Sequence, residues 1–161
     1  MLLGVVSDTH GNVHLTRRAI RMLESLQVEA VLHCGDIGTA EIIHMFEPWQ
    51  THFVFGNTDH DQPTLRRAIQ QAKLTCHERY GELELAERKI ALLHSDDARK
   101  FAEVCQSGQF DLVCYGHTHL AKQERVGKTL ILNPGAIHRA SPHSIAVVDL
   151  FEMQATIVPL D

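Results

Sequence analysis

The sequence lacks long apolar runs, and this absence bears on whether the protein crosses a membrane. No apolar segment approaches the roughly 18 residues that a membrane-spanning helix needs, so we expect no membrane span and no membrane partner. The first residues, MLLGVVSDTHG, contain no basic region and become polar too early for a secretory signal. These features favour a cytoplasmic protein.

Basic blocks and closely spaced cysteines are also missing. The formal net charge is −5, which gives no support to long nucleic acid as a ligand. No C-x-x-C pair occurs, so neither a zinc knuckle nor a redox motif is expected, and the cysteines are interpreted as reduced; they are Cys34, Cys76, Cys105 and Cys114. The motifs G-x-x-x-x-G-K-[ST], G-x-G-x-x-G, H-E-x-x-H and G-x-S-x-G are absent. Nucleotide cradling, zincin chemistry and serine hydrolysis therefore have no support.

Histidine is abundant, with 12 residues among 161. It is the commonest metal ligand in proteins and the usual acid or base near neutral pH. The length is close to that of one domain, so we expect a single domain over residues 1–161. A chain of this size buries roughly 70% of its unfolded surface and can form a core without disulfides.

The first half of the chain alternates short apolar runs with amphipathic segments. The runs predict strands at Leu2–Ser7, Ala30–His33 and Thr51–Phe55. The amphipathic segments predict helices at Val13–Leu26, Thr39–Phe46 and Pro63–Ala72, with Asn12 as the first N-cap. This β-α-β-α-β-α order implies right-handed crossovers and a largely parallel sheet.

The second half contains mostly strands. Three alternating segments predict consecutive antiparallel strands with turns at Gly81 and Glu87-Arg88; they are Leu74–Tyr80, Glu82–Ala86 and Lys89–His94. A helix is expected at Asp97–Gln106, and Gly127-Lys128 predicts a hairpin turn. The remaining strands are Asp111–Tyr115, Ala121–Val126, Thr129–Leu132, Ser144–Phe151 and Ala155–Pro159. The whole pattern predicts an α/β domain of two packed sheets with helices outside, and an exposed hairpin edge could pair in a homo-oligomer.

Polar side chains follow the apolar runs at several strand ends. They are Asp8 and His10, Asp36, Asn57, His94, and His117 and His119. In an α/β sheet, ligand sites form outside the carboxyl ends of the strands, so these groups should converge. Residues two apart in extended chain point to the same side, so Asp8 with His10, and His117 with His119, can each direct two donors into one cleft.

Each of these residues has an ordinary explanation when taken alone. Asp8 could cap the next helix, Asp36 and Asn57 could be turn residues after glycine, and His94 could be a core histidine. The pair His117 and His119 could be a polar loop. Together these explanations are less convincing, because clustered carboxylates and imidazoles at buried strand ends are costly unless they are paired. Divalent cations provide such pairing.

The ordered set Asp8-x-His10, Gly35-Asp36, Gly56-Asn57, His94 and Gly116-His117-x-His119 resembles the calcineurin-like metallophosphoesterase superfamily. The GNTD variant at residues 56–59 and the following Asn133-Pro134-Gly135 are most similar to its small YfcE-type phosphodiesterase branch. The resemblance implies a four-layer αββα sandwich of two mixed sheets and a centre of two divalent metal ions. By motif, Asp8, His10, Asp36 and His119 would hold one ion, and Asp36, Asn57, His94 and His117 the other. The donor set suits Mn²⁺, which we expect by resemblance, or Fe, Zn²⁺ or Ni²⁺.

The implied function is a phosphodiesterase that hydrolyses small phosphate esters with a hydroxide shared by the two ions. Asp36, Asn57 and His94 would be catalytic as well as metal ligands. Two other functions stay open: a non-catalytic protein-interaction module on the same fold, and a nuclease. The acidic balance and the lack of a large capping domain argue against the nuclease.

Three positions depart from the pattern of the family. Thr58 stands where many relatives have a histidine that can protonate the leaving group, and His60, Asp59 and His14 are candidates for that role, with His60 preferred. Ser95 replaces the usual glycine after His94, and the stretch Ser95-Asp96-Asp97 could crowd the second ion or cap the following helix. Ala136 replaces a serine that often follows Asn-Pro-Gly.

Overall fold

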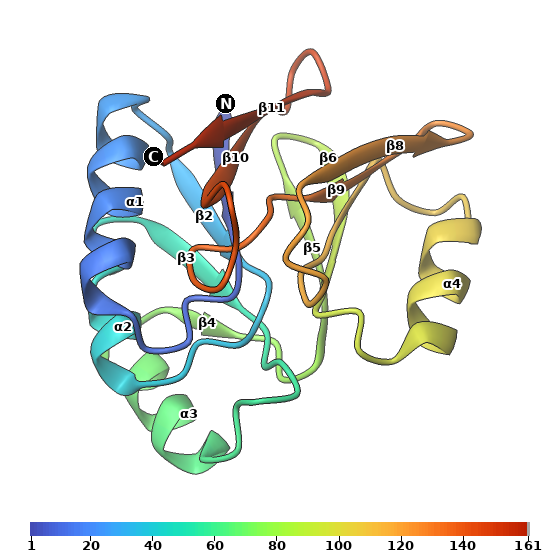
Figure 1. The fold of residues 1–161 in the computed structure, drawn as a ribbon. Coiled ribbons are helices and arrows are strands. Elements are labelled where there is room, and N and C mark those ends of the chain that lie inside the picture. The colour runs from blue at the N-terminus through green and yellow to red at the C-terminus, as the bar shows by residue number, and fades with distance from the viewer. Residues whose placement is uncertain (161) are drawn as a thin grey trace.

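A computed structural model describes residues 1–160 as two β-sheets packed face to face (Figure 1). The six strands of the larger sheet are β1 (Leu2–Val6), β2 (Ala30–His33), β3 (Gln50–Phe53), β4 (Thr75–Cys76), β10 (Ser144–Asp149) and β11 (Gln154–Pro159). Their order is β11-β10-β1-β2-β3-β4. The second sheet contains β5 (Tyr80–Leu85), β6 (Arg88–Leu93), β7 (Leu112–Cys114), β8 (Lys122–Val126) and β9 (Thr129–Asn133), in the order β5-β6-β7-β9-β8. Both sheets combine parallel and antiparallel pairs, as predicted.

Helices cover the outer faces of the two sheets (Figure 1). They are α1 (Val13–Ser25), α2 (Ala40–His44), α3 (Gln62–Gln71) and α4 (Ala98–Gln106). The first three pack on the larger sheet, where Leu23, Ile42 and Leu65 join one buried cluster with Phe53. The fourth packs on the smaller sheet. The predicted four-layer αββα sandwich is confirmed, and within residues 1–160 no helix has the length and apolar character to cross a membrane.

Three of the helices begin at a side chain that accepts a hydrogen bond from the first turn. Asn12 accepts from the Leu15 N–H, Asp61 from the Thr64 N–H, and Asp97 from the Lys100 N–H. Such N-caps satisfy backbone donors that have no partner inside the helix. The predicted cap at Asn12 is therefore confirmed, and within Ser95-Asp96-Asp97 it is Asp97 that caps α4.

Parallel pairing places the carboxyl ends of the central strands together. Strands β1, β2 and β3 run parallel, with Val6 opposite His33 and His33 opposite Phe53. In the smaller sheet, β6, β7 and β9 are also parallel. The loops that follow β1, β2, β3, β6 and β7 carry all seven predicted ligand positions.

The prediction of three consecutive antiparallel strands from Leu74 was wrong in its first member. Only Thr75–Cys76 forms a strand, and it pairs in parallel with β3 in the other sheet. Gly81 lies inside β5 and not in a turn. A side chain at this position would overlap the imidazole of His77. The turn that follows β5 lies at Ala86-Glu87, one residue earlier than predicted, and both residues have positive φ, 48° and 62°. The hairpin turn at Gly127-Lys128 is confirmed.

Candidate metal centre

One group of ligand atoms surrounds the carboxylate of Asp8, which is fully buried. Its Oδ1 lies 3.7 Å from His10 Nε2 and 3.2 Å from His119 Nε2. The other oxygen, Oδ2, accepts hydrogen bonds from Ser7 Oγ at 2.6 Å and from the His117 N–H at 3.2 Å. Asp8 Oδ1 and His10 Nε2 are buried and form no hydrogen bond with any described residue. Leaving such atoms unpaired is costly, and a cation between them would remove that cost.

A second group surrounds Asp36. Its Oδ2 lies 3.3 Å from His94 Nε2 and 3.6 Å from His10 Nε2, while its Oδ1 accepts from the Thr58 N–H at 2.9 Å. Asn57 Oδ1 lies 3.1 Å from His94 Nε2 and 3.0 Å from His117 Nδ1. Asp36 therefore contacts histidines of both groups, which is the position required of a bridging ligand.

Backbone carbonyls determine which ring nitrogen faces the centre. His94 Nδ1 lies 2.8 Å from the Cys34 carbonyl, and His119 Nδ1 lies 3.1 Å from the Arg139 carbonyl. A carbonyl can only accept, so each Nδ1 carries a proton, and Nε2 is the ring nitrogen that faces a carboxylate and could bind a metal ion. Metal-binding histidines are commonly oriented in this way. The donor set therefore fits divalent cations, and the candidate groups are Asp8, His10 and His119, and Asp8, Asp36 and His94.

The charges at the centre shift the pKa values of the buried groups. Burial alone would raise the pKa of Asp36, but contacts with His94 and the Thr58 N–H outweigh it and hold that pKa well below its usual range. The pKa of Asp8 is likewise lowered, since its contacts with His10 and Ser7 outweigh burial, which would raise it. Burial would lower the pKa of His94, but Asp36 and Asp8 raise it overall. The carboxylates thus keep a negative charge that attracts cations.

Five of the seven candidate ligands have a left-handed backbone, which is unusual for residues other than glycine. The φ angles are 57° at Asp8, 45° at His10, 55° at Asp36, 71° at His117 and 60° at His119. Each such residue costs roughly 1–3 kcal/mol, so it persists only where surrounding contacts hold it in place. Clustering of this strain at one site supports a functional role.

Two glycines of the motif make room for the carboxylates. A side chain at Gly116 would overlap Ser7 Oγ, which donates to Asp8. A side chain at Gly56 would overlap Asp36 Oδ1. The glycines are therefore required by close approach of backbone to the candidate ligands.

Several residues support the centre in ways that the sequence did not predict. The buried carboxylate of Asp59 accepts from the backbone N–H groups of Ile37, Gly38 and Gly56, at 3.2, 3.0 and 2.8 Å. It thereby ties the loop after β2 to the loop after β3. The position of Asp59 two residues after Asn57, in GNTD, was the feature of the sequence that pointed to it. The sequence suggested that Asp59 transfers a proton. In the structure, both of its carboxylate oxygens accept hydrogen bonds from backbone N–H groups.

A buried histidine lies behind the centre. His33 Nδ1 accepts from the Gly35 N–H at 3.2 Å, and its Nε2 lies 3.0 Å from Thr9 Oγ1. The Thr9 hydroxyl donates in turn to the Ile37 carbonyl at 2.9 Å. This network joins the loops that carry Asp8 and Asp36.

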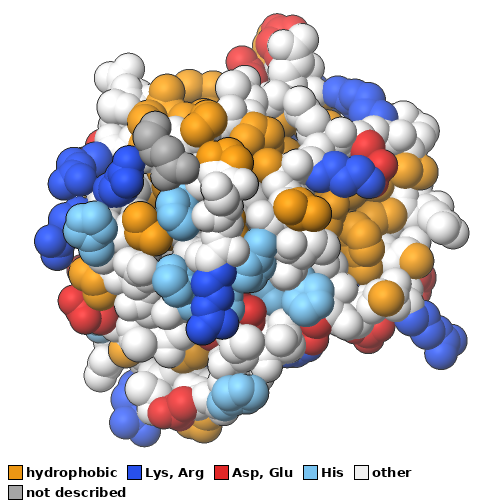
Figure 2. Space-filling view, in the orientation of Figure 1, with side chains coloured by type: hydrophobic (Ala, Val, Ile, Leu, Met, Phe, Trp, Pro, Cys, Tyr) orange, Lys and Arg blue, Asp and Glu red, His pale blue; other side chains and the backbone are white. Residues whose placement is uncertain are grey.

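The structure does not bring His60 into the group. Its side chain is exposed and forms no hydrogen bond or ion pair with residues 1–160. Ser95 has φ of 80° and donates from Oγ to the Gly116 carbonyl at 3.2 Å. Figure 2 shows histidine side chains gathered on one face of the molecule, next to acidic groups.

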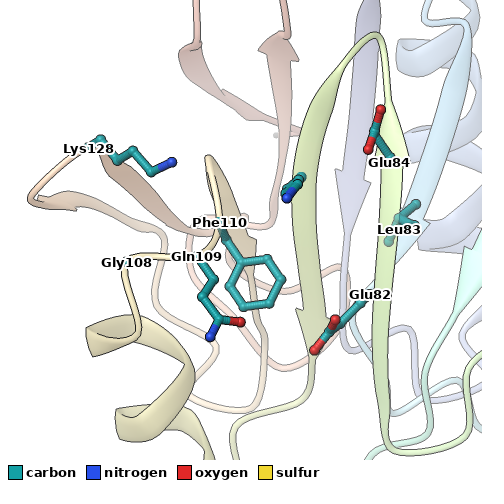
Figure 3. A pocket seen from close by; sticks show the side chains of 8 residues that line it. Glu82, Leu83, Glu84, Gly108, Gln109, Phe110 and Lys128 are labelled. Carbon is teal, nitrogen blue, oxygen red and sulfur yellow. The ribbon is translucent and has the colours of Figure 1, made fainter.

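A hollow of about 600 Å³ lies elsewhere, on the smaller sheet (Figure 3). Glu82 and Glu84 of β5 line one side, and Phe110 and Lys128 line the other. None of the seven candidate ligands lines this hollow. Its mixed charges indicate no particular ligand, so the candidate centre is the better functional site.

Comparison with known proteins identifies the family of this chain. Residues 1–155 match the model of the calcineurin-like phosphoesterase superfamily domain. A phosphodiesterase from Methanocaldococcus jannaschii is 30% identical over 138 residues, which cover 84% of this chain and 83% of that protein. A solved structure described as a novel archaeal phosphodiesterase has a TM-score of 0.91 at 26% identity and covers 99% of both chains. YfcE, a phosphoesterase from E. coli, has a TM-score of 0.69 at 17% identity over the full length of both. The chain belongs to the calcineurin-like phosphoesterase superfamily and is a phosphoester hydrolase.

Proposed function

We propose that the protein is a phosphodiesterase that hydrolyses small phosphate esters with two divalent metal ions, preferably Mn²⁺. The observation that carries this proposal concerns two buried atoms, Asp8 Oδ1 and His10 Nε2. They lie 3.7 Å apart beside Asp36, and neither forms a hydrogen bond with a described residue. The phosphodiesterase from M. jannaschii supports the substrate class. A cytoplasmic location is part of the same proposal.

The candidate ligands divide into two sets that share Asp36. We assign Asp8, His10, Asp36 and His119 to one ion and Asp36, Asn57, His94 and His117 to the other. When bound, the ions would supply Lewis acidity and lower the pKa of a shared water toward neutrality. Imidazole, carboxylate and amide donors suit Mn²⁺, Fe, Zn²⁺ or Ni²⁺, so affinity alone does not select one.

The protein's own residues provide the shape and the charge of the site. Asp8 and Asp36 are buried, whereas Asn57 and His117 are exposed, so the centre opens to solvent on one side. An ester can approach from that side while the carboxylates stay shielded. The N-terminus of α1 follows His10 closely and adds the positive end of a helix dipole near the bound phosphate.

The alternatives predict different behaviour. A non-catalytic interaction module would not need the ligand positions, yet all seven are filled and adjoining. A nuclease for long nucleic acid would be expected to have a basic surface, whereas the formal net charge is −5. Both observations favour a small-ester hydrolase.

Hydrolysis of a chromogenic aryl phosphodiester tests the proposal. The purified protein should be inactive after chelation and regain turnover with Mn²⁺, more than with Mg²⁺ or Ca²⁺. The aryl diester should be hydrolysed faster than an oligonucleotide. Equal rates with and without chelator would contradict metal dependence, and faster turnover of the oligonucleotide would favour the nuclease.

A further inference from the structure

We propose that His138 binds the phosphate ester by donating a hydrogen bond from Nε2, and that Asn12 selects the tautomer that makes this possible. The inference rests on the proposed function, because it concerns the substrate of that site. Neither residue is among the seven candidate ligands.

The backbone holds His138 at the rim of the candidate centre. The Ile137 N–H donates to the Ser7 carbonyl at 3.1 Å, and the His138 N–H donates to the Asp8 carbonyl at 3.0 Å. The next carbonyl, of Arg139, accepts from His119 Nδ1. The segment is therefore fastened to both sides of the first ligand group, and the ring centroid of His138 lies 6.1 Å from that of His10.

Asn12 determines where the proton of His138 resides. Its Oδ1 accepts from the Leu15 N–H at 3.0 Å as the N-cap of α1. The amide oxygen is thereby identified, so the group that faces His138 Nδ1 at 3.0 Å is the NH₂. An NH₂ can only donate, so Nδ1 must accept. The neutral ring then carries its proton on Nε2.

The Nε2–H group is free to meet a ligand. The side chain of His138 is half-buried, and Nε2 forms no hydrogen bond with any described residue. A neutral N–H donor beside the centre suits a phosphoryl oxygen of a bound ester. Thr58, at the position where the family often has histidine, offers no imidazole, and its N–H is already bonded to Asp36. His138 provides a ring donor near His10.

The tautomer can be measured directly on the metal-free protein. Nitrogen-15 correlation spectra of histidine-labelled protein near neutral pH should show a protonated Nε2 and an unprotonated Nδ1 for His138. The resonances of His138 are identified by their absence from the spectrum of His138→Gln. Asn12→Ser keeps a good N-cap but removes the amide, so the helix should remain and the tautomer preference should weaken. A wild-type Nδ1–H tautomer would overturn the inference.

Binding and kinetics test the contact with phosphate. His138→Ala should raise both KM for the aryl diester and the inhibition constant of inorganic phosphate by about tenfold, the loss expected for a hydrogen bond to a charged group. His138→Gln retains an N–H donor, so both constants should rise less than in His138→Ala. In Asn12→Ser, KM and the inhibition constant should each rise several-fold. Mn²⁺ affinity should not change in any of these variants. The matched control is His44→Ala, because the side chain of His44 is exposed on α2.

The possible outcomes separate the two proposals. Unchanged KM and phosphate inhibition in His138→Ala, with an active wild type, would overturn the role of His138 alone. A wild type that hydrolyses no ester would contradict the proposed function. In that case, addition of inorganic phosphate to Zn²⁺-loaded protein still tests whether His138 contacts phosphate. The Nε2 resonance of His138 should shift, and an unchanged resonance would overturn the proposed contact.

Discussion

Asp36→Asn is expected to lower kcat/KM for the aryl phosphodiester by about a thousandfold, because loss of several kcal/mol of transition-state stabilisation corresponds to about that factor. The carboxylate of Asp36 contacts imidazoles of both groups, His10 and His94. Asparagine has a similar shape but no negative charge, so the cations would lose their shared anionic ligand. The loss should be accompanied by a lower Mn²⁺ stoichiometry, measured by metal analysis after gel filtration.

Asp61→Asn is the matched control for this substitution. Asp61 is the N-cap of α3, and asparagine caps helices as well as aspartate does. Its activity and Mn²⁺ content should equal those of the wild type. Wild-type kcat/KM in Asp36→Asn would show that this carboxylate does not hold the metal ions that act in the reaction.

Acid should destabilise the protein well above the pH at which its carboxylates titrate. Burial lowers the pKa of His33 to about 3 and the pKa of His52 to about 4, both from an unfolded value near 6.5. Below pH 6.5 the unfolded chain therefore binds more protons than the folded chain, and stability falls as pH falls toward 4. From pH 7 to pH 5 the loss is about 2 kcal/mol for each histidine, or about 4 kcal/mol together.

Urea unfolding at the two pH values checks this expectation in chelator. The raised pKa of His94 has the opposite effect on stability, because folding favours the protonated form of this residue. Comparison with variants therefore isolates the contribution of each histidine to the loss of stability. In His33→Gln and in His52→Gln, the loss between pH 7 and pH 5 should be about 2 kcal/mol smaller than in the wild type. His60→Gln, at an exposed position, should show the wild-type loss, and the same loss in all variants would contradict the account.

The arrangement of the candidate centre could be anticipated because it depends on strand ends. Apolar runs identified β1, β2 and β3, and parallel strands necessarily bring their carboxyl ends to one edge. The polar residues that follow each run were therefore predicted to converge. The left-handed backbone of Asp8 and Asp36 could not be read from residue type, because neither side chain requires it.

The parts that escaped prediction depend on contacts between distant residues. Segment 74–80 alternates like a strand, but tertiary packing places only Thr75–Cys76 in a sheet, beside β3. Gly81 looked like a turn residue because its real constraint, the neighbouring ring of His77, is visible only in three dimensions. Asn12 and His138 lie 126 positions apart, so no local pattern connects them.

Anomalous diffraction at the manganese edge, from crystals grown with excess Mn²⁺, tests the central claim most directly. We predict two peaks, one bound by Asp8, His10 and His119 and one by Asn57, His94 and His117, with Asp36 between them. Well-ordered ligand side chains without a manganese peak, or manganese bound away from these residues, would contradict the account.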